Sequence, residues 1–290
     1  MKQLLVITGP TGVGKTELCL SLAEQLGSPV INADSRQIYR ELPIGTAAPT
    51  AVEQARVRHY FVGTKSITED YNAGSYERDC LALLDTLFRD HDTLILSGGS
   101  MMYIDAVCNG LDDIPSVPQD VRRSVQDGYR EHGLDWLQAE VKRLDPEYWN
   151  IVDQANPQRL MHCVEVSLSA GKPYSSFRTG QPAKRPFAIR KIALERPREE
   201  LYERINARVI SMIDAGLVDE ARSVLPFRNL NSLNTVGYKE MFRYLDGEWT
   251  LDKAIQMIQQ NSRHYAKRQL TWLRADKTIE WHNVNSGLHL

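Results

Sequence analysis

The chain has 290 residues, of which 42% are hydrophobic and 25% are charged, enough for a large core in one or two domains. Its formal net charge of −2 at pH 7 excludes the basic balance of a protein that coats nucleic acid, so a polyanionic partner would need a local basic patch. The four cysteines lack Cys-x-x-Cys spacing and predict free thiols. We expect a cytoplasmic protein without a membrane role, because a glycine-rich loop begins at Gly9, too early for a signal peptide, and no apolar run reaches about 18 residues.

A phosphate-binding loop joins the first predicted strand, residues 4–8, to the first predicted helix, residues 17–26. The segment between them fits G-x-x-x-x-G-K-[ST] and consists of Gly9, Pro10, Thr11, Gly12, Val13, Gly14, Lys15 and Thr16. In this pattern backbone N–H groups surround phosphate oxygens, Lys15 adds a positive charge, and the Thr16 hydroxyl can bind Mg²⁺. The sequence therefore predicts a site for a di- or triphosphate, as in nucleotide-binding and ATP-binding proteins.

Two later strands end in polar residues. Residues 29–33 predict a strand that ends at Asp34, and residues 93–97 predict another that ends in Gly98-Gly99-Ser100. Strands that alternate with amphipathic helices predict an α/β fold, a parallel sheet flanked by helices like that of the P-loop NTPases. Because ligands bind at the carboxyl ends of such strands, we expect the phosphate loop, Asp34 and Ser100 to converge.

The middle of the chain lacks strand patterns and predicts an inserted helical subdomain at residues 113–186. The catalytic core is then residues 1–112 and 187–290. Helices are predicted in the insertion at residues 121–131, 134–144 and 157–170. The remaining elements of the core are a strand at residues 187–195, helices at 198–215, 217–225, 237–245 and 251–273, and a short strand at 278–281.

The phosphate loop predicts a ligand but no reaction. The residues alone leave open a small-molecule or nucleotide kinase, with Asp34 on the acceptor hydroxyl, and a non-catalytic RNA-binding module. Asp34 is the candidate general base, and the alternative is a carboxylate that holds Mg²⁺ through water or binds a ribose or small-molecule hydroxyl. Arg204 and Arg208 share a helix face and would ordinarily pair with nearby glutamates, while Ser100 would ordinarily cap a helix.

Four further segments follow the phosphate loop in order, and together with it they resemble the tRNA dimethylallyltransferases, also called tRNA isopentenyltransferases. They read DSRQIYR at residues 34–40, IGTA at 44–47, GGSMMY at 98–103 and AKRQLTWLR at 266–274. Shorter matches at residues 156–160, 204–209 and 236–239 extend the resemblance over nearly the whole chain.

The resemblance implies transfer of a dimethylallyl group from its diphosphate to N6 of the adenosine on the 3′ side of the tRNA anticodon, with release of diphosphate. The phosphate loop would hold the diphosphate, with Mg²⁺ as cofactor on Thr16. The expected partners are dimethylallyl diphosphate and the tRNA anticodon stem-loop, and the expected state is a monomer. A free-AMP isopentenyltransferase shares this chemistry but would not need residues 156–160 or the long insertion.

The resemblance also assigns residues. Asp34 would be the general base, Ser100, where many members have threonine, would contact the target amine, and Arg208 would reach the diphosphate. The implied tRNA contacts are Asp34, Ser35, Arg36, Gln37, Ser100, Arg122, Gln158, Arg159, Leu160, Met161, His162, Asn234, Thr235, Val236, Gly237, Tyr238 and Lys239.

Two departures from the family pattern bear on RNA binding, because Ala48 replaces a usual lysine and His162 stands where arginine is common. Both could alter tRNA selectivity. Position and charge further suggest a basic clamp on the RNA backbone, formed by Arg122, Arg123, Lys184 and Arg185.

Overall fold

The computed structural model describes residues 2–286 of the chain. These residues form two compact units, the first reaching to Cys108 and resuming at Arg185, the second running from Asn109 to Lys184. The sequence predicts the divisions after residues 112 and 186. No helix within residues 2–286 combines the length and the apolar character of a membrane span.

A six-stranded sheet in the order β3-β2-β4-β1-β5-β6 forms the centre of the first unit, and each neighbouring pair is parallel. The strands are β1 (Gln3–Thr8), β2 (Val30–Asn32), β3 (His59–Tyr60), β4 (Thr93–Ser97), β5 (Ala188–Glu195) and β6 (Ile279–Asn283). The predicted parallel α/β sheet is confirmed. Because β2, β4 and β1 are neighbours, the chain segments that leave their carboxyl ends lie side by side.

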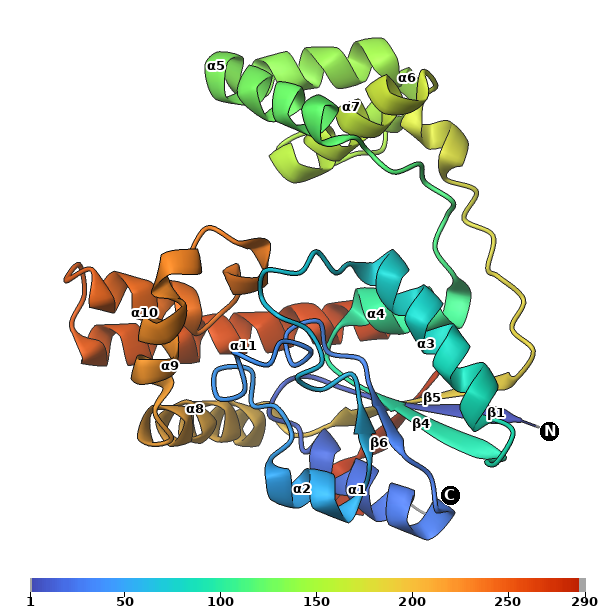
Figure 1. Ribbon diagram of the computed structural model, residues 1–290, viewed down its shortest axis with the longest axis vertical. Coiled ribbons are helices and arrows are strands. Elements are labelled where there is room, and N and C mark those ends of the chain that lie inside the picture. Colours follow the sequence, from blue (N-terminus) through green and yellow to red (C-terminus); the bar gives the residue numbers. More distant parts are fainter. Residues whose placement is uncertain (1, 287–290) are drawn as a thin grey trace. The chain divides into compact units, whose positions relative to one another are not determined.

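Helices cover both faces of the sheet, and the side chains of β1 alternate between the two layers. Leu5 and Ile7 pack with α1 (Lys15–Leu26), whereas Leu4 and Val6 pack with α3 (Ala73–Leu87) and α4 (Met101–Asn109). Figure 1 shows α1 and the short α2 (Ala51–Arg56) on one side of the strands and α3 with α4 on the other. Burial on both faces explains why the strands read as continuous apolar runs.

The carboxyl-terminal helices form a third core cluster beside the sheet. They are α8 (Arg198–Asp214), α9 (Leu217–Val224), α10 (Tyr238–Leu245) and α11 (Leu251–Ala275), with short 3₁₀ turns at Leu225–Phe227 and Asn231–Leu233. A further 3₁₀ turn, Val284–Ser286, follows β6. The long α11 begins in this cluster, where Ala254 and Ile258 are buried, and continues to the sheet, where Ala266 packs with the α1 layer. One helix therefore links the third cluster to the α1 layer of the sheet.

The second unit is a small helical bundle with its own core. It contains α5 (Gln119–Leu144), α6 (Pro146–Trp149), α7 (Pro157–Ala170) and a 3₁₀ turn at Tyr174–Phe177. Gly133 interrupts α5 with a φ of 74°, so the two predicted helices are separated where the sequence places their junction. Asp145 is fully buried and accepts hydrogen bonds from the Tyr148 N–H and from the Ser175 N–H and hydroxyl, which ties α6 to the following turn.

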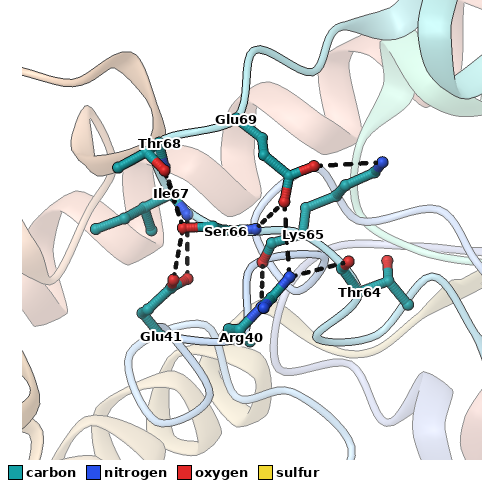
Figure 2. Close-up of polar contacts among 8 residues, drawn as sticks. All are labelled: Arg40, Glu41, Thr64, Lys65, Ser66, Ile67, Thr68 and Glu69. Atoms are coloured by element: carbon teal, nitrogen blue, oxygen red, sulfur yellow. Dashed lines mark hydrogen bonds and ion pairs between the residues drawn. The ribbon is translucent and has the colours of Figure 1, made fainter.

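The segment after β2 is fastened to residues 64–69 by a polar network, shown in Figure 2. Glu41 accepts hydrogen bonds from the Ser66 hydroxyl at 2.7 Å and from a backbone N–H of the same segment at 3.1 Å. The Arg40 side chain donates to the carbonyl oxygens of Thr64 and Lys65 and forms an ion pair with Glu69. This network holds Arg40 and Glu41, in the middle of the segment that runs from Asp34 to α2.

Candidate active site

The phosphate loop takes a backbone path that only glycine adopts readily. Gly9 and Gly12 have φ values of 145° and 81°, in the left-handed range. A Cβ on Gly9 would lie 2.9 Å from the Leu194 carbonyl oxygen, and one on Gly12 would lie 2.9 Å from Ile205 Cγ1. The glycines therefore let the loop lie against β5 and α8. The Val13 side chain is buried in the core, so this residue offers the site only its backbone.

Lys15 begins α1 and turns its ammonium group back over the loop. Its Nζ donates to the carbonyl oxygens of Gly9 at 2.9 Å and Pro10 at 3.0 Å. Burial of the ammonium, and then the positive charge of Arg208, lower the pKa of Lys15 to about 8, although the Asp34 carboxylate opposes the shift. A lysine whose charged form is this disfavoured gains from a nearby anion.

Arg208 of α8 supplies a second cation to the same loop. Its guanidinium donates to the Thr11 hydroxyl at 3.4 Å and to the Thr46 carbonyl at 3.3 Å. Burial lowers the pKa of Arg208, while the charge of Asp34 raises it. One turn away, Arg204 donates to the Gly12 carbonyl at 2.9 Å. These arginines thus point to the phosphate loop, and the expectation that they pair with neighbouring glutamates is wrong.

Asp34 directly follows β2 and presents one oxygen to the site. Its Oδ1 accepts the backbone N–H groups of Arg36 at 2.9 Å and Gln37 at 3.3 Å. Its Oδ2 makes no hydrogen bond to another residue within residues 2–286, and a Cβ placed on Gly99 would lie 3.3 Å from it. The carboxylate is therefore held by one oxygen while the other faces the end of β4, which suits a proton acceptor.

Ser100 joins the end of β4 to the segment after β2. Ser100 is only 8% exposed, and its hydroxyl accepts the Ser35 N–H at 2.8 Å and donates to the Ser35 hydroxyl at 2.9 Å. The interpretation of Ser100 as an ordinary cap of α4 is wrong, because the hydroxyl bonds to another loop. The phosphate loop, Asp34 and Ser100 are thus close together, as the strand ends predict.

Two predicted RNA-contacting side chains in this region bind the protein itself. Gln37 donates from Nε2 to the Thr46 and Ala47 carbonyl oxygens at 3.1 and 3.0 Å, and Arg36 donates to the Asn231 and Ser232 carbonyls at 2.8 and 3.0 Å. Both anchor loops at the rim of the site.

Burial divides the other predicted tRNA contacts. Leu160 and Tyr238 are fully buried and Met161 is 8% exposed, so the side chains of these three residues pack in the core. Their contact with tRNA stays a prediction. Gly237 is also buried, Thr235 and Val236 are partly buried, and the exposed members are Gln158, Arg159, His162, Asn234 and Lys239.

The proposed basic clamp is only partly compatible with the structure. Arg185 lies in the first unit, where its buried guanidinium donates to Glu77 at 2.6 Å and to the Val107 and Ala106 carbonyls. It is therefore a structural residue, and its inclusion in the clamp is wrong. Arg122 lies in the second unit, half exposed, 3.9 Å from Glu165.

Two residues near the site have roles that the sequence did not indicate. Gln269 of α11 accepts the Thr11 N–H at 2.8 Å and donates to the Gly99 carbonyl at 2.8 Å. Glu220 of α9 accepts the N–H groups of Ile44 and Gly45 at 2.8 Å, which holds the loop whose Thr46 carbonyl binds Arg208. Gln269 stands in a matched segment and was an available signal, but its bonding partners are remote in sequence.

The residues fit the Mg²⁺ that the sequence analysis expects only with help from a substrate. No group of three His, Cys, Asp or Glu side chains within residues 2–286 could hold a metal ion. Thr16 lies in the first turn of α1, next to Lys15. Mg²⁺ usually keeps several waters and binds substrate phosphate oxygens, and in P-loop NTPases the Ser or Thr of the loop is one of its protein ligands.

A parallel sheet, a glycine-rich loop before α1 and two cations over that loop define a protein with a P-loop-like fold. The model of the family "IPP transferase" matches residues 37–276. tRNA dimethylallyltransferase 1 of Phocaeicola vulgatus is 58% identical over 278 residues, covering 96% of this chain and 93% of that protein. The tRNA dimethylallyltransferase of Cytophaga hutchinsonii is 45% identical over 97% of this chain and 92% of that protein. This chain belongs to the IPP transferase family.

Two solved structures share the fold. The full-length tRNA isopentenylpyrophosphate transferase of Bacillus halodurans is 33% identical with a TM-score of 0.71, over 98% of this chain and 90% of that chain. A eukaryotic dimethylallyltransferase acting on tRNA has a TM-score of 0.83 at 24% identity, over 98% of this chain and 74% of that one, and supports the fold alone. These likenesses confirm the P-loop-like architecture expected from the loop and the strand order.

Proposed function

We propose that this protein is a tRNA dimethylallyltransferase that moves the dimethylallyl group of dimethylallyl diphosphate to N6 of the adenosine on the 3′ side of the anticodon. The observation that carries the proposal is the convergence of two cations, Lys15 and Arg208, on the phosphate loop beside the carboxylate of Asp34. Relatives of 45 and 58% identity that cover nearly the whole chain bear the name of this activity.

The reaction needs one bond broken, one bond formed and one proton moved. N6 of the adenine attacks C1 of the dimethylallyl group, the C1–O bond breaks, and its electron pair leaves with the diphosphate. The proton from N6 passes to Oδ2 of Asp34, the oxygen that is not hydrogen-bonded to the backbone. Negative charge that grows on the leaving diphosphate is stabilised by Lys15, by Arg208 and by the N–H groups at the start of α1.

Magnesium fits this proposal as a cofactor. Mg²⁺ bound to the diphosphate would neutralise part of its charge and make it a better leaving group. Thr16 is the residue that would hold it. The chain itself contributes the fixed donors of the loop, which need not reorganise when the C1–O bond breaks.

For the tRNA, we propose recognition of the anticodon stem-loop by the exposed polar residues of both units. Gln158 and Arg159 are exposed at the start of α7, Arg122 is half exposed on α5, and Asn234 and Lys239 are exposed in the first unit. Amide side chains can bond to base edges, and arginine or lysine to phosphates. The target base must leave the stacked loop to reach Asp34, as for other enzymes that act on a base.

The test is incubation of the purified protein with dimethylallyl diphosphate, Mg²⁺ and an unmodified anticodon stem-loop, followed by mass spectrometry of the RNA. We expect one added dimethylallyl group per stem-loop, and its loss in Asp34→Asn. The matched control is Asp214→Asn, since Asp214 is exposed at the end of α8. Prenylated AMP without prenylated RNA would favour the free-nucleotide enzyme, and phosphoryl transfer from ATP would favour a kinase.

A further inference from the structure

Gln269 connects the two halves of the site through one side-chain amide. Its Oε1 accepts the N–H of Thr11 in the phosphate loop, and its Nε2 donates to the carbonyl of Gly99 at the end of β4, both at 2.8 Å. The partners lie 258 and 170 positions away in the sequence. Gln269 is 3% exposed, so water does not readily replace either bond.

Both sides of this bridge lead directly to residues of the proposed reaction. The Thr11 hydroxyl accepts a hydrogen bond from the Arg208 guanidinium, so the position of Thr11 affects the part of the site that would hold the diphosphate. Gly99 precedes Ser100, whose hydroxyl holds Ser35, the residue after Asp34. The amide of Gln269 therefore lies between the group that binds the donor and the group that binds the acceptor.

The shape of the site depends on this contact as well. A Cβ on Gly99 would lie 2.9 Å from Gln269 Nε2 and 3.3 Å from Asp34 Oδ2. The glycine thus lets the amide and the carboxylate approach the same point of the backbone. Tyr265, one turn before Gln269 on α11, also donates to the Gly99 carbonyl, at 3.2 Å. Two donors from one helix fix this single carbonyl.

We propose that Gln269 is a positioning residue that sets the spacing between the phosphate loop and the Asp34–Ser100 side of the site. It thereby aligns C1 of the bound dimethylallyl diphosphate with the attacking amine. The proposal rests on the proposed function. Only a side chain with an acceptor and a donor at glutamine's reach makes both bonds. Gln269 touches neither reacting group, so its loss changes alignment more than substrate binding.

The experiment compares Gln269→Ala and Gln269→Asn with wild type in steady-state prenylation of the stem-loop. Asparagine keeps both polar groups but is one methylene too short to span the partners. We expect kcat to fall about 100-fold in both variants while KM for either substrate changes less than about threefold. The matched control is Gln260→Ala, because Gln260 is an exposed glutamine of the same helix. Activity of Gln269→Asn equal to that of wild type, or a loss confined to KM, would overturn the proposal.

A second measurement tests the bridge independently of the reaction. Hydrogen–deuterium exchange of the peptide that contains Thr11 should become at least about tenfold faster in Gln269→Ala and Gln269→Asn and stay unchanged in Gln260→Ala, because Thr11 N–H loses its acceptor. Unchanged exchange in both Gln269 variants refutes the bridge. If wild type transfers no dimethylallyl group but the exchange responds as expected, the proposed function fails and the bridge stands. Should Gln269→Ala fail to fold, Gln269→Asn must by itself show both the loss of kcat and the faster exchange at Thr11.

Discussion

Binding of the diphosphate should weaken as the pH rises through the titration of Lys15. In the unliganded protein, burial and the charge of Arg208 lower the pKa of this lysine to about 8, so it is mostly charged at pH 7 and mostly neutral at pH 9. A bound diphosphate favours the charged form and raises the pKa again. The ligand has already lost its last proton, since phosphate groups do so near pH ~6. The pH dependence between 7 and 9 is therefore assigned to the protein.

The size of the effect follows from the pKa alone. With a free-state pKa of about 8 and a bound lysine that stays charged, the charged fraction falls about tenfold from pH 7 to pH 9. The dissociation constant for dimethylallyl diphosphate should rise by the same factor, about 1.4 kcal/mol. At pH 8 about half of the lysines must take up a proton on binding, so complex formation should consume about half a proton.

Isothermal titration calorimetry in buffers of different ionisation enthalpy measures both quantities. Lys15→Met should bind weakly at all pH values and show no proton uptake. Lys253→Met is the matched control, because Lys253 is exposed on α11, and it should retain the wild-type profile. A wild-type dissociation constant that is constant from pH 7 to pH 9, or uptake near zero at pH 8, would refute the assignment of the depressed pKa to Lys15.

Three further predictions concern buried or partly buried contacts, each measured by urea-induced unfolding. Glu220→Ala should cost about 2 to 4 kcal/mol, because it leaves two backbone N–H groups and the Tyr238 hydroxyl without their carboxylate, whereas exposed Glu199→Ala should cost under about 0.5 kcal/mol. Gly98→Ala should cost about 3 kcal/mol, since the added Cβ would lie 2.1 Å from the carbonyl oxygen of Ala33, the residue after β2. Asp145→Ala should cost the second unit about 3 kcal/mol and Asp145→Asn less; equal costs would contradict its role as an acceptor of three hydrogen bonds.

The elements that the sequence predicts well have chemical signals at both ends. The structure has α7 at Pro157–Ala170, as predicted, because Asn156 accepts the Arg159 N–H before it and Gly171 takes a φ of 64° after it. The strand at Thr93–Ser97 is an apolar run that ends in glycines. By contrast, the patterns predict no element between residues 41 and 92, where α2, β3 and α3 lie. A strand of two residues shows no alternation, and its identity depends on pairing with β2.

Side-chain roles were harder to predict than elements. The resemblance assigns whole segments to the tRNA. A helix has 3.6 residues per turn, however, so the side chains of successive residues point in different directions, some to the core and some to the surface. Within the predicted contact at residues 158–162, Arg159 is exposed while Leu160 is fully buried. The apolar positions Leu160 and Val164, four apart, already indicate a core-facing stripe, so periodicity could have separated these residues.

The strand ends predict that the phosphate loop, Asp34 and Ser100 converge, and β1, β2 and β4 are neighbours in the sheet. The remaining contacts of the site could not be found by periodicity, because they depend on helices from the far end of the chain. Arg208 and Gln269 then reach the same loop from α8 and α11. A local pattern shows that such residues are polar on helices, and their ordinary role is to face water. Their partners are fixed only when the first and last thirds of the chain pack together, so an isolated phosphate loop would have neither the second cation nor the amide that holds it in place.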